Sequence, residues 1–379
     1  MVLRVRDVTG WMESTYAPAW AEDWDAVGLV CGDPEQPVRK ILFAVDPAPP
    51  VVEEALSWGA DLLVVHHPLL LKPVSSVAAD SPKGHALHSL VRAGCALFTA
   101  HTNADAPPRG VSESLATAVG IVDPRPLVPA APDGLDKLVT FVPHENAEEL
   151  RAAITAAGAG ALGDYDSCTF TTTGEGRFRP LDGATPAIGR VGEVEVVAES
   201  RVESVFPRAR RREVVEAMKA VHPYEEPAYD VLELAAQPGG ASSRGDGRIG
   251  RLAEPVSLRA FAERVAAALP STAHGVRVAG DPDRVVETVA VTGGAGDFLL
   301  DAVLGTDADV YLTSDLRHHR AAEFLEHGGA ALVDVAHWAA EWTWLPVLER
   351  ALVDGLDTAG VTVDTRVSTT CTDPWSFRV

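Results

Sequence analysis

Short apolar runs alternate with helical patterns at both ends of the chain, and this alternation limits the possible folds more than any other feature. Residues 41–120 contain ILFAVD, DLLVVHH and CALFTAHTNAD, with the helical patterns PPVVEEALSWG, GHALHSLVRAG and VSESLATAVG between and after them. Residues 285–352 repeat this arrangement with VVETVAVTGGAG, DVYLTSD and ALVDVAH. Alternating strands and helices predict a mostly parallel sheet. We therefore expect the two ends to be halves of one layered α/β domain.

The pattern changes in the middle of the chain. DKLVTFVP, NAEELRAAITAAG, two alternating polar stretches, REVVEAMKAV and AYDVLEL follow one another as β-α-β-β-α-β, the order of ferredoxin-like domains. Linker-like segments, PRPLVPAAPDG and QPGGASSRGDG, bound this region. We therefore predict an α/β main domain, residues 1–132 and 246–379, interrupted by a ferredoxin-like α+β insert, residues 133–245.

Composition excludes several classes of partner. Acidic residues outnumber basic ones 54 to 32, for a net charge of -22, and no run of Lys or Arg with interleaved aromatics occurs. Nucleic acid and anionic membrane are therefore poor partners. No apolar stretch reaches the length of a signal peptide or a membrane span, so we expect a cytoplasmic protein. The four cysteines form no CxxC pair, so any metal must be bound by histidine and carboxylate.

Histidines and carboxylates follow the predicted strands, at the edge where open α/β sheets bind ligands. They are His66 and His67, His101 and Asp105 in HTNAD, Asp315 in TSD, and His337 in DVAH. The spacing of His337 and Glu341 puts both side chains on one face of a helical turn. Pro68 favours extended backbone at His67, so both adjacent imidazoles can turn toward one cavity.

We predict metal ligands at His66, His67, Asp105, His337 and Glu341. Three imidazoles and two carboxylates are too many for one tetrahedral catalytic ion that keeps a water, but they suit two ions about 3.5–4 Å apart, as in two-metal hydrolases. Adjacent histidines or an HxxxE pair are, by themselves, more often core or surface features. The expected convergence of Asp105 and His337, which are 232 residues apart (337 minus 105), favours a metal site over these simpler interpretations. Zn, Mn, Fe, Co and Ni all suit these ligands.

Three further motifs have weaker signals. TGGAGD, at Gly293 to Gly296, can cradle an anion or can be only a turn. In TSDLRHH, Asp315 and His319 are candidate catalytic residues, as a proton shuttle or as partners of the ligands. HPYEEPAYD, from His222, combines a histidine with carboxylates but most simply forms a structural loop.

The motifs WDAVGLVCGDP, HHP, HTNAD, GGAG, YLTSDLRHH and DVAHWAAEW occur in an order and at a spacing that resemble the Nif-three-like dinuclear metal-centre family, often labelled GTP cyclohydrolase I type 2. The resemblance implies a toroidal hexamer, a two-metal site in each subunit, and an insert similar to PII or CutA-like modules. It places the ligands on the same five residues, with His101 as a near neighbour of the metals. Ala26, Ser314 and Trp338 depart from the family pattern, and none of them is a ligand.

Two functions of different classes follow. The first is a metal-dependent hydrolase that uses a metal-bridging water on a nucleotide or phosphoester; the family label implies opening of the guanine ring of GTP. The second is a non-enzymatic, ring-shaped regulator or metal-handling protein whose insert senses a ligand or docks a partner. Removal of residues 133–245 distinguishes the two functions, because a regulator loses ligand or partner binding when the insert is removed.

Overall fold

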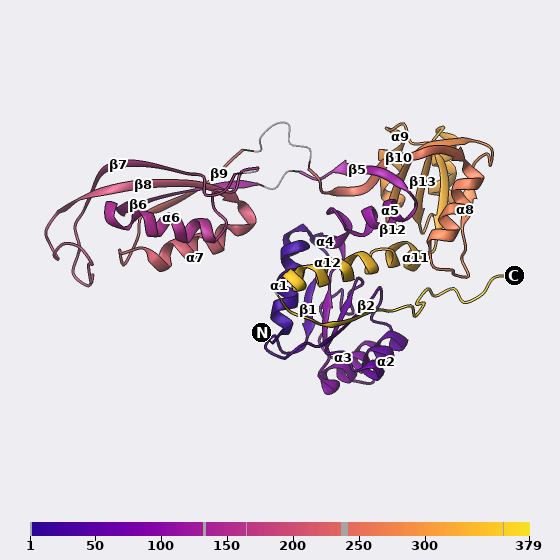
Figure 1. Ribbon diagram of the computed structural model, residues 1–379, viewed down its shortest axis with the longest axis horizontal. Helices are drawn as coiled ribbons and strands as arrows, with labels where there is room; N and C mark the ends of the chain where they lie inside the picture. Colours follow the sequence, from indigo (N-terminus) through magenta and orange to yellow (C-terminus); the bar gives the residue numbers. More distant parts are fainter. Residues whose placement is uncertain (1, 132–133, 164, 236–241, 359) are drawn as a thin grey trace. The chain divides into compact units, whose positions relative to one another are not determined.

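The computed structural model describes residues 2–131, 134–163, 165–235, 242–358 and 360–379. The chain divides into two compact units. The main unit comprises Met1–Ala130 and Ser242–Val379, and the insert unit comprises Ala131–Ala241 (Figure 1). In the described parts of the chain, no helix combines the length and apolarity needed to cross a membrane.

The first sheet of the main unit has five strands in the order β1-β4-β3-β2-β15. Strands β15, β2, β3 and β4 run parallel, and β1 pairs antiparallel with β4. Along β2, Ile41 and Phe43 pack with α1 and α12, whereas Leu42 and Ala44 pack with α2 and α3. The sheet is therefore the middle of three layers. Its elements are α1 (Val5–Thr15), β1 (Gly28–Cys31), β2 (Lys40–Ala44), α2 (Pro49–Trp58), β3 (Leu62–Val65), α3 (Pro82–Ala93), β4 (Ala96–Thr99), α12 (Leu345–Thr358) and β15 (Asp364–Val367).

The second sheet has six strands in the order β11-β14-β13-β12-β10-β5. Only β12, β13 and β14 are parallel neighbours among these strands; the other pairs are antiparallel. Helices α5 and α8 cover one face, and α9 and α10 cover the other. The elements are α5 (Val111–Ala118), β5 (Ile121–Pro129), β10 (Gly245–Ser257), α8 (Leu258–Ala268), β11 (Arg277–Ala279), β12 (Val285–Ala295), α9 (Leu300–Leu304), β13 (Val310–Ser314), α10 (His318–Glu326) and β14 (Ala331–Val335).

The main unit is thus a mixed α/β fold with two sheets, where the sequence pattern led us to expect halves of one layered domain. The βα repeat predicts local strand and helix units, but it does not determine which strands pair across the chain. Helix α11 (His337–Trp342) packs against both sheets. Trp338 and Ala339 lie in the core of the first sheet, and Ala340 lies in the core of the second.

Backbone signals fix the bounds of helices in the first layer. Helix α3 begins at Pro82 after Ser81, whose hydroxyl accepts a hydrogen bond from the Gly84 amide. It ends at Gly94, which has a left-handed φ of 69°. The short helix α4 (Thr102–Asp105) begins directly after His101, so one turn of helix carries Asp105 back toward the end of β3.

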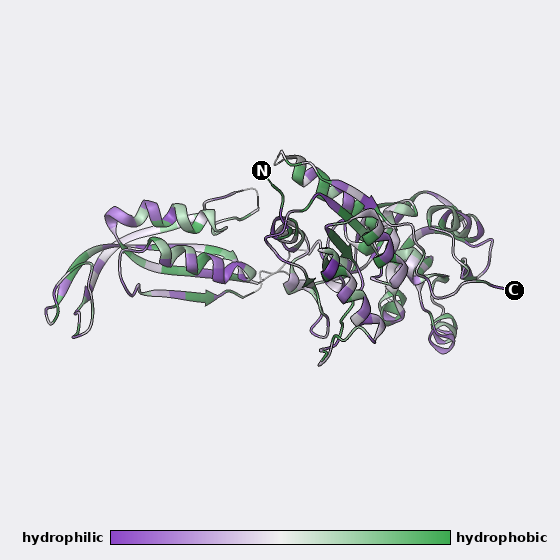
Figure 2. Ribbon diagram, turned by 90° about the horizontal axis from the view of Figure 1, so that it is seen from below, coloured by the Kyte–Doolittle hydropathy of each residue, from purple (hydrophilic) through white to green (hydrophobic). Residues whose placement is uncertain are grey.

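The insert unit has one antiparallel sheet in the order β7-β8-β6-β9. Its elements are β6 (Leu135–Pro143), α6 (Ala147–Ala156), β7 (Thr169–Phe178), β8 (Glu195–Pro207), α7 (Arg211–Val221) and β9 (Tyr229–Glu233). Leu150, Ile154, Val214 and Met218 pack α6 and α7 on Val202 and its neighbours in the sheet. Both helices therefore cover the same face, and each shows hydrophobic and hydrophilic residues in Figure 2.

The chain segments that border the insert are paired within each unit. In the main unit, β5 pairs antiparallel with β10, Gly245 is opposite Pro129, and the Ala130 amide donates to the Arg244 carbonyl at 2.9 Å. In the insert unit, β6 pairs with β9, and the Leu234 amide donates to the Leu135 carbonyl at 2.9 Å. Each unit therefore holds its own two chain ends together.

We expect Asp136→Asn to destabilise the insert unit by about 1.5–3 kcal/mol at neutral pH. Asp136 is buried and accepts hydrogen bonds from Arg208 Nε at 3.0 Å and from Arg211 Nε at 2.6 Å. Although burial raises its pKa, the two arginines outweigh burial and hold the pKa below the usual range. Because this pKa is lowered in the folded state, the stabilisation is present above the unfolded value of about 3.9 and is lost as pH falls further.

Far-UV circular dichroism during urea unfolding between pH 3 and pH 7 measures this effect. Tryptophan fluorescence is the internal control, because all eight tryptophans lie outside residues 131–241. A variant that matches the native chain at pH 7 would contradict the prediction.

Candidate functional site

The carboxyl ends of strands from both sheets supply the site. His66 and His67 follow β3, and His101 with Asp105 follow β4, all from the first sheet. His337 follows β14 of the second sheet and is the first residue of α11. The predicted residues therefore converge from two sheets rather than from one sheet edge. Helix α11, packed between the two cores, brings them together.

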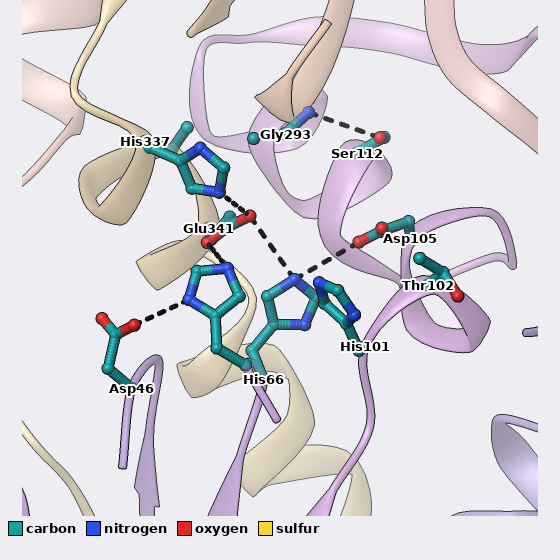
Figure 3. A network of polar contacts seen from close by, with 12 residues as sticks. Asp46, His66, His101, Thr102, Asp105, Ser112, Gly293, His337 and Glu341 are labelled. Carbon is teal, nitrogen blue, oxygen red and sulfur yellow. Dashed lines mark hydrogen bonds and ion pairs between the residues drawn. The ribbon is translucent and has the colours of Figure 1, made fainter. Parts of the chain in front are cut away.

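Glu341 lies at the centre of the cluster (Figure 3). Its Oε1 is 2.8 Å from His337 Nε2 and 3.4 Å from His66 Nε2, and its Oε2 is 3.1 Å from His67 Nε2. Asp105 Oδ1 lies 3.5 Å from His66 Nε2. The structure thus brings together all five residues that we predicted as metal ligands.

Each imidazole is held through its Nδ1 atom. His66 Nδ1 donates to the Ala100 carbonyl at 2.9 Å, and the other three contact carboxylates: His67 with Asp46 at 2.7 Å, His101 with Asp25 at 2.8 Å, and His337 with Asp315 at 2.6 Å. This arrangement turns the Nε2 atoms of His66, His67 and His337 toward Glu341. Metal-ligating histidines are oriented in this way, by an acceptor on the other ring nitrogen.

The donor set fits divalent metal. Two overlapping groups, His66 with His67 and His101, and His67 with His337 and Glu341, each have ligand atoms within 4.8 Å of one another. His66 Nε2, Asp105 Oδ1 and Glu341 Oε2 are buried without a hydrogen-bond partner. Buried polar atoms are normally satisfied, and among the described residues these three make ion-pair contacts but no hydrogen bond. A metal ion bound among them would satisfy all three.

Electrostatics couples the members of the cluster. Burial raises the pKa of Glu341, but His67, His337 and His66 outweigh burial and hold it well below the usual range. Burial lowers the pKa of His337, but Glu341 and Asp315 raise it to about 10. Burial and the Glu341 charge together raise the pKa of Asp105 to about 7. Imidazoles must be deprotonated to bind metal, so metal binding here releases protons.

The two predicted catalytic residues differ in their placement. Asp315 directly follows β13 with a left-handed φ of 58° and contacts His337, so it is positioned beside the cluster. His319 is exposed on α10, where its ring contacts the ring of His318. Asp315 therefore lies in position to orient a ligand, whereas the contacts of the described residues do not connect His319 to the cluster.

Gly294 explains the glycine-rich motif at the end of β12. A Cβ atom at this residue would lie 2.6 Å from Glu341 Oε1 and 3.3 Å from His337 Nε2, and the backbone has a φ of 70°. Only glycine permits this approach without a shift. Gly293 lies in the same network, with its amide facing the Ser112 hydroxyl (Figure 3).

Sequence reasoning did not identify two carboxylates that position ligands. Asp46 ends the run ILFAVD, so its place at a strand end was a usable signal, and the Thr372 hydroxyl donates to it. Asp25 lies in WDAVGLVCGDP and accepts from the Thr102 amide as well as contacting His101. Trp338, which departs from the family pattern, is only 5% exposed and belongs to the core of the first sheet.

Comparisons with known proteins agree with the motifs. A protein of Mycobacterium tuberculosis named GTP cyclohydrolase 1 type 2 homolog is 51% identical over 382 residues, which cover 100% of this chain and 98% of the relative. A Bacillus subtilis protein of the same name is 37% identical, with coverage of 95% and 94%. The crystal structure of a Bacillus cereus protein related to NIF3 has a TM-score of 0.81 and 34% identity, with 100% of both chains covered.

The family model described as Duf34/NIF3 (NGG1p interacting factor 3) matches residues 3–374. This match spans both halves of the main unit and the whole insert unit. The chain therefore belongs to the DUF34/NIF3 family.

Proposed function

We propose that this protein is a metal-dependent hydrolase that holds two divalent ions on His66, His67, Asp105, His337 and Glu341. The observation that carries the proposal is the convergence of four Nδ1-anchored imidazoles, three of which face the buried carboxylate of Glu341. Two overlapping ligand groups that share His67 favour two ions over one. Zn, Mn, Fe, Co and Ni remain equal candidates for this donor set.

A pair of such ions lowers the pKa of water and polarises the bond to be hydrolysed. The chain's own residues provide the geometry. Glu341 faces three imidazoles and can bridge, while Asp46 and Asp315 hold the rings of His67 and His337. We retain Asp315 as the residue that orients His337 and accepts its Nδ1 proton; proton transfer by His319 stays a prediction.

An exposed aromatic side chain supports a nucleotide-like substrate. Trp24 is 59% exposed, and its ring lies edge-on to His101 at a centroid distance of 5.9 Å. A planar base can stack on such a ring next to the reacting bond. This placement favours a nucleotide over a simple phosphoester as substrate, in keeping with the name of the relatives, GTP cyclohydrolase 1 type 2 homolog.

We further propose the organisation that the resemblance implies. Residues 133–245 form a ferredoxin-like module of the PII/CutA kind, supported by the sheet order β7-β8-β6-β9 with both helices on one face. Residues 1–132 and 246–379 form the dinuclear-metal domain. The chain assembles as a cytoplasmic homohexamer.

Turnover measurements test the hydrolase proposal. Chelator-stripped protein is reloaded with Zn or Mn and screened against GTP, other nucleotides and phosphoesters. We expect metal-dependent product from the native chain and at least a 100-fold loss in Asp105→Asn, with Asp80→Asn, an exposed aspartate, as the matched control. Equal turnover in Asp105→Asn and the native chain, or no product in the presence of metal, would overturn the proposal for those substrates.

The second candidate function is a non-enzymatic metal-binding regulator whose insert senses a ligand. A cavity confined to the insert unit favours this alternative. If regulation is the function, replacing residues 131–241 with a short turn abolishes ligand or partner binding, and no turnover is found for any variant.

A further inference from the structure

The insert unit contains a cavity of about 850 Å³ on the face of its sheet that α6 and α7 leave uncovered. Val202 and Phe206 of β8 pack on the helices, so Glu199 and Arg201, which alternate with them, point to the opposite face. Phe141, Gly176, Phe178 and Tyr224 also line the cavity. The segment 179–194 borders it and is fixed by a hydrogen bond from the Thr185 amide to Glu225 Oε2 at 2.9 Å. A volume of this size accommodates a small ligand.

The cavity contains a buried carboxylate. Glu199 is 7% exposed, and its Oε1 accepts a hydrogen bond from the Tyr224 hydroxyl at 2.7 Å. A Cβ atom at residue 176 would lie 2.1 Å from Glu199 Oε2, so the glycine at this position makes room for the carboxylate over strand β7. The site is therefore built by three elements: β7, β8 and the loop that contains HPYEEP.

No cation of the described residues neutralises Glu199 through an ion pair. The nearby His222 uses both ring nitrogens, Nε2 with the Phe141 carbonyl at 3.0 Å and Nδ1 with the Tyr224 amide at 3.2 Å. Arg201, on the same strand, pairs with Glu203 at 3.0 Å. Buried carboxylates are normally paired with a cation, because an isolated buried charge is costly. Glu199 therefore leaves a place in the cavity for a cationic group of a ligand.

Aromatic rings surround this carboxylate. Phe178 and Tyr224 meet edge to face with centroids 5.5 Å apart, and Phe141 lies on the neighbouring strand β6. Five carboxylates but three guanidinium groups line the cavity, so its charge is net negative. Aromatic faces next to a carboxylate attract ammonium and guanidinium groups and disfavour anions.

We propose that this cavity of the insert unit binds a small organic cation, an amine or guanidinium compound, through Glu199 and the rings of Phe141, Phe178 and Tyr224. The proposal is independent of the metal site, because every lining residue belongs to the insert unit. It also gives the HPYEEP loop a function: Tyr224 donates to the recognition carboxylate, and Glu225 fixes the bordering segment.

Isothermal titration of the full chain with spermidine, agmatine and choline tests the proposal, with ATP as the anionic comparator. We expect at least one of the three cations to bind and ATP to leave the cavity empty. Glu199→Gln keeps the shape and the acceptor for Tyr224 but removes the charge, and we expect it to weaken binding about 10- to 100-fold. Phe178→Leu removes one ring, and we expect a loss of about 2- to 5-fold.

Glu213→Gln is the matched control, because it removes the same charge from the exposed surface of α7 in the same unit. It is expected to bind as the native chain does. Thermal unfolding of each variant confirms that the fold is kept. Failure of all three cations to bind, equal affinity in Glu199→Gln, or competition by ATP at this site would overturn the proposal.

Discussion

The Glu341→Gln variant is expected to lose its divalent ions while keeping its fold. Glu341 faces three imidazoles, with oxygens 2.8–3.4 Å from their Nε2 atoms, and it is the carboxylate of the ligand group that also contains His67 and His337. Glutamine has the same shape but no charge. Loss of a residue that only orients a ligand already costs 10- to 100-fold in metal affinity, so we expect more than about 100-fold here.

Elemental analysis and titration of chelator-stripped protein with Zn measure this loss. Asp46→Asn, which alters only the support of His67, is expected to lose about 10- to 100-fold and so to lie between Glu341→Gln and the native chain. Glu326→Gln, at the exposed end of α10, is the control for the charge change. If Glu341→Gln retains the native metal content and affinity, then the cluster is not a metal site and its convergence has another cause.

The second large effect is expected for Arg248→Met, which we predict to destabilise the main unit by about 3–5 kcal/mol. Arg248 on β10 is fully buried. Its guanidinium contacts Glu113 at 3.2 Å and donates at 2.8 Å to four backbone carbonyls, those of Ala106, Pro107, Gly245 and Gly247. Methionine fills part of the volume but removes the guanidinium from Glu113 and from the four carbonyls, two of which, those of Ala106 and Pro107, keep a backbone amide donor.

Urea unfolding followed by tryptophan fluorescence checks this prediction, since the tryptophans report the main unit alone. Arg251→Met is a matched control on the same strand. Arg251 pairs with Glu287 at 2.8 Å, but its side chain is 66% exposed, so we expect a change of at most about 1 kcal/mol. Equal losses in the two variants would show that the buried network around Arg248 has no special role.

The sequence was sufficient for the parts of the site that depend on local pattern. His66, His101 and His337 each follow an apolar run, and the structure places each directly after a strand. The i, i+4 spacing of His337 and Glu341 is realised on the first turns of α11. Pairing between distant strands was not predictable in this way, because the hydrophobic pattern of a strand reports which of its faces are buried and not which strand lies beside it. The two separate sheets and the antiparallel β5–β10 pair therefore appear only in three dimensions.

The supporting carboxylates illustrate the same limit. Asp25 lies 76 residues before His101, and Asp46 lies 21 residues before His67, so no short spacing marks either pair. Asp46 at least shares the strand-end position of the ligands. Asp25 lies before β1 in an irregular segment, and only the fold shows that it reaches the turn after β4.

The adjacent chain ends of the insert have a consequence for how such a protein can arise and fold. As an unstructured loop, the 111 residues from 131 to 241 (241 minus 130) would cost about 3 kcal/mol more closure entropy than a four-residue turn between β5 and β10. The β6–β9 pairing removes much of that penalty, because the folded insert already presents its ends as neighbours. Translation also completes the insert before β10 to β15 exist, so it can fold first, with its two ends already close together. A whole domain can thus be gained or lost at this point with little thermodynamic disturbance to the two sheets of the main unit.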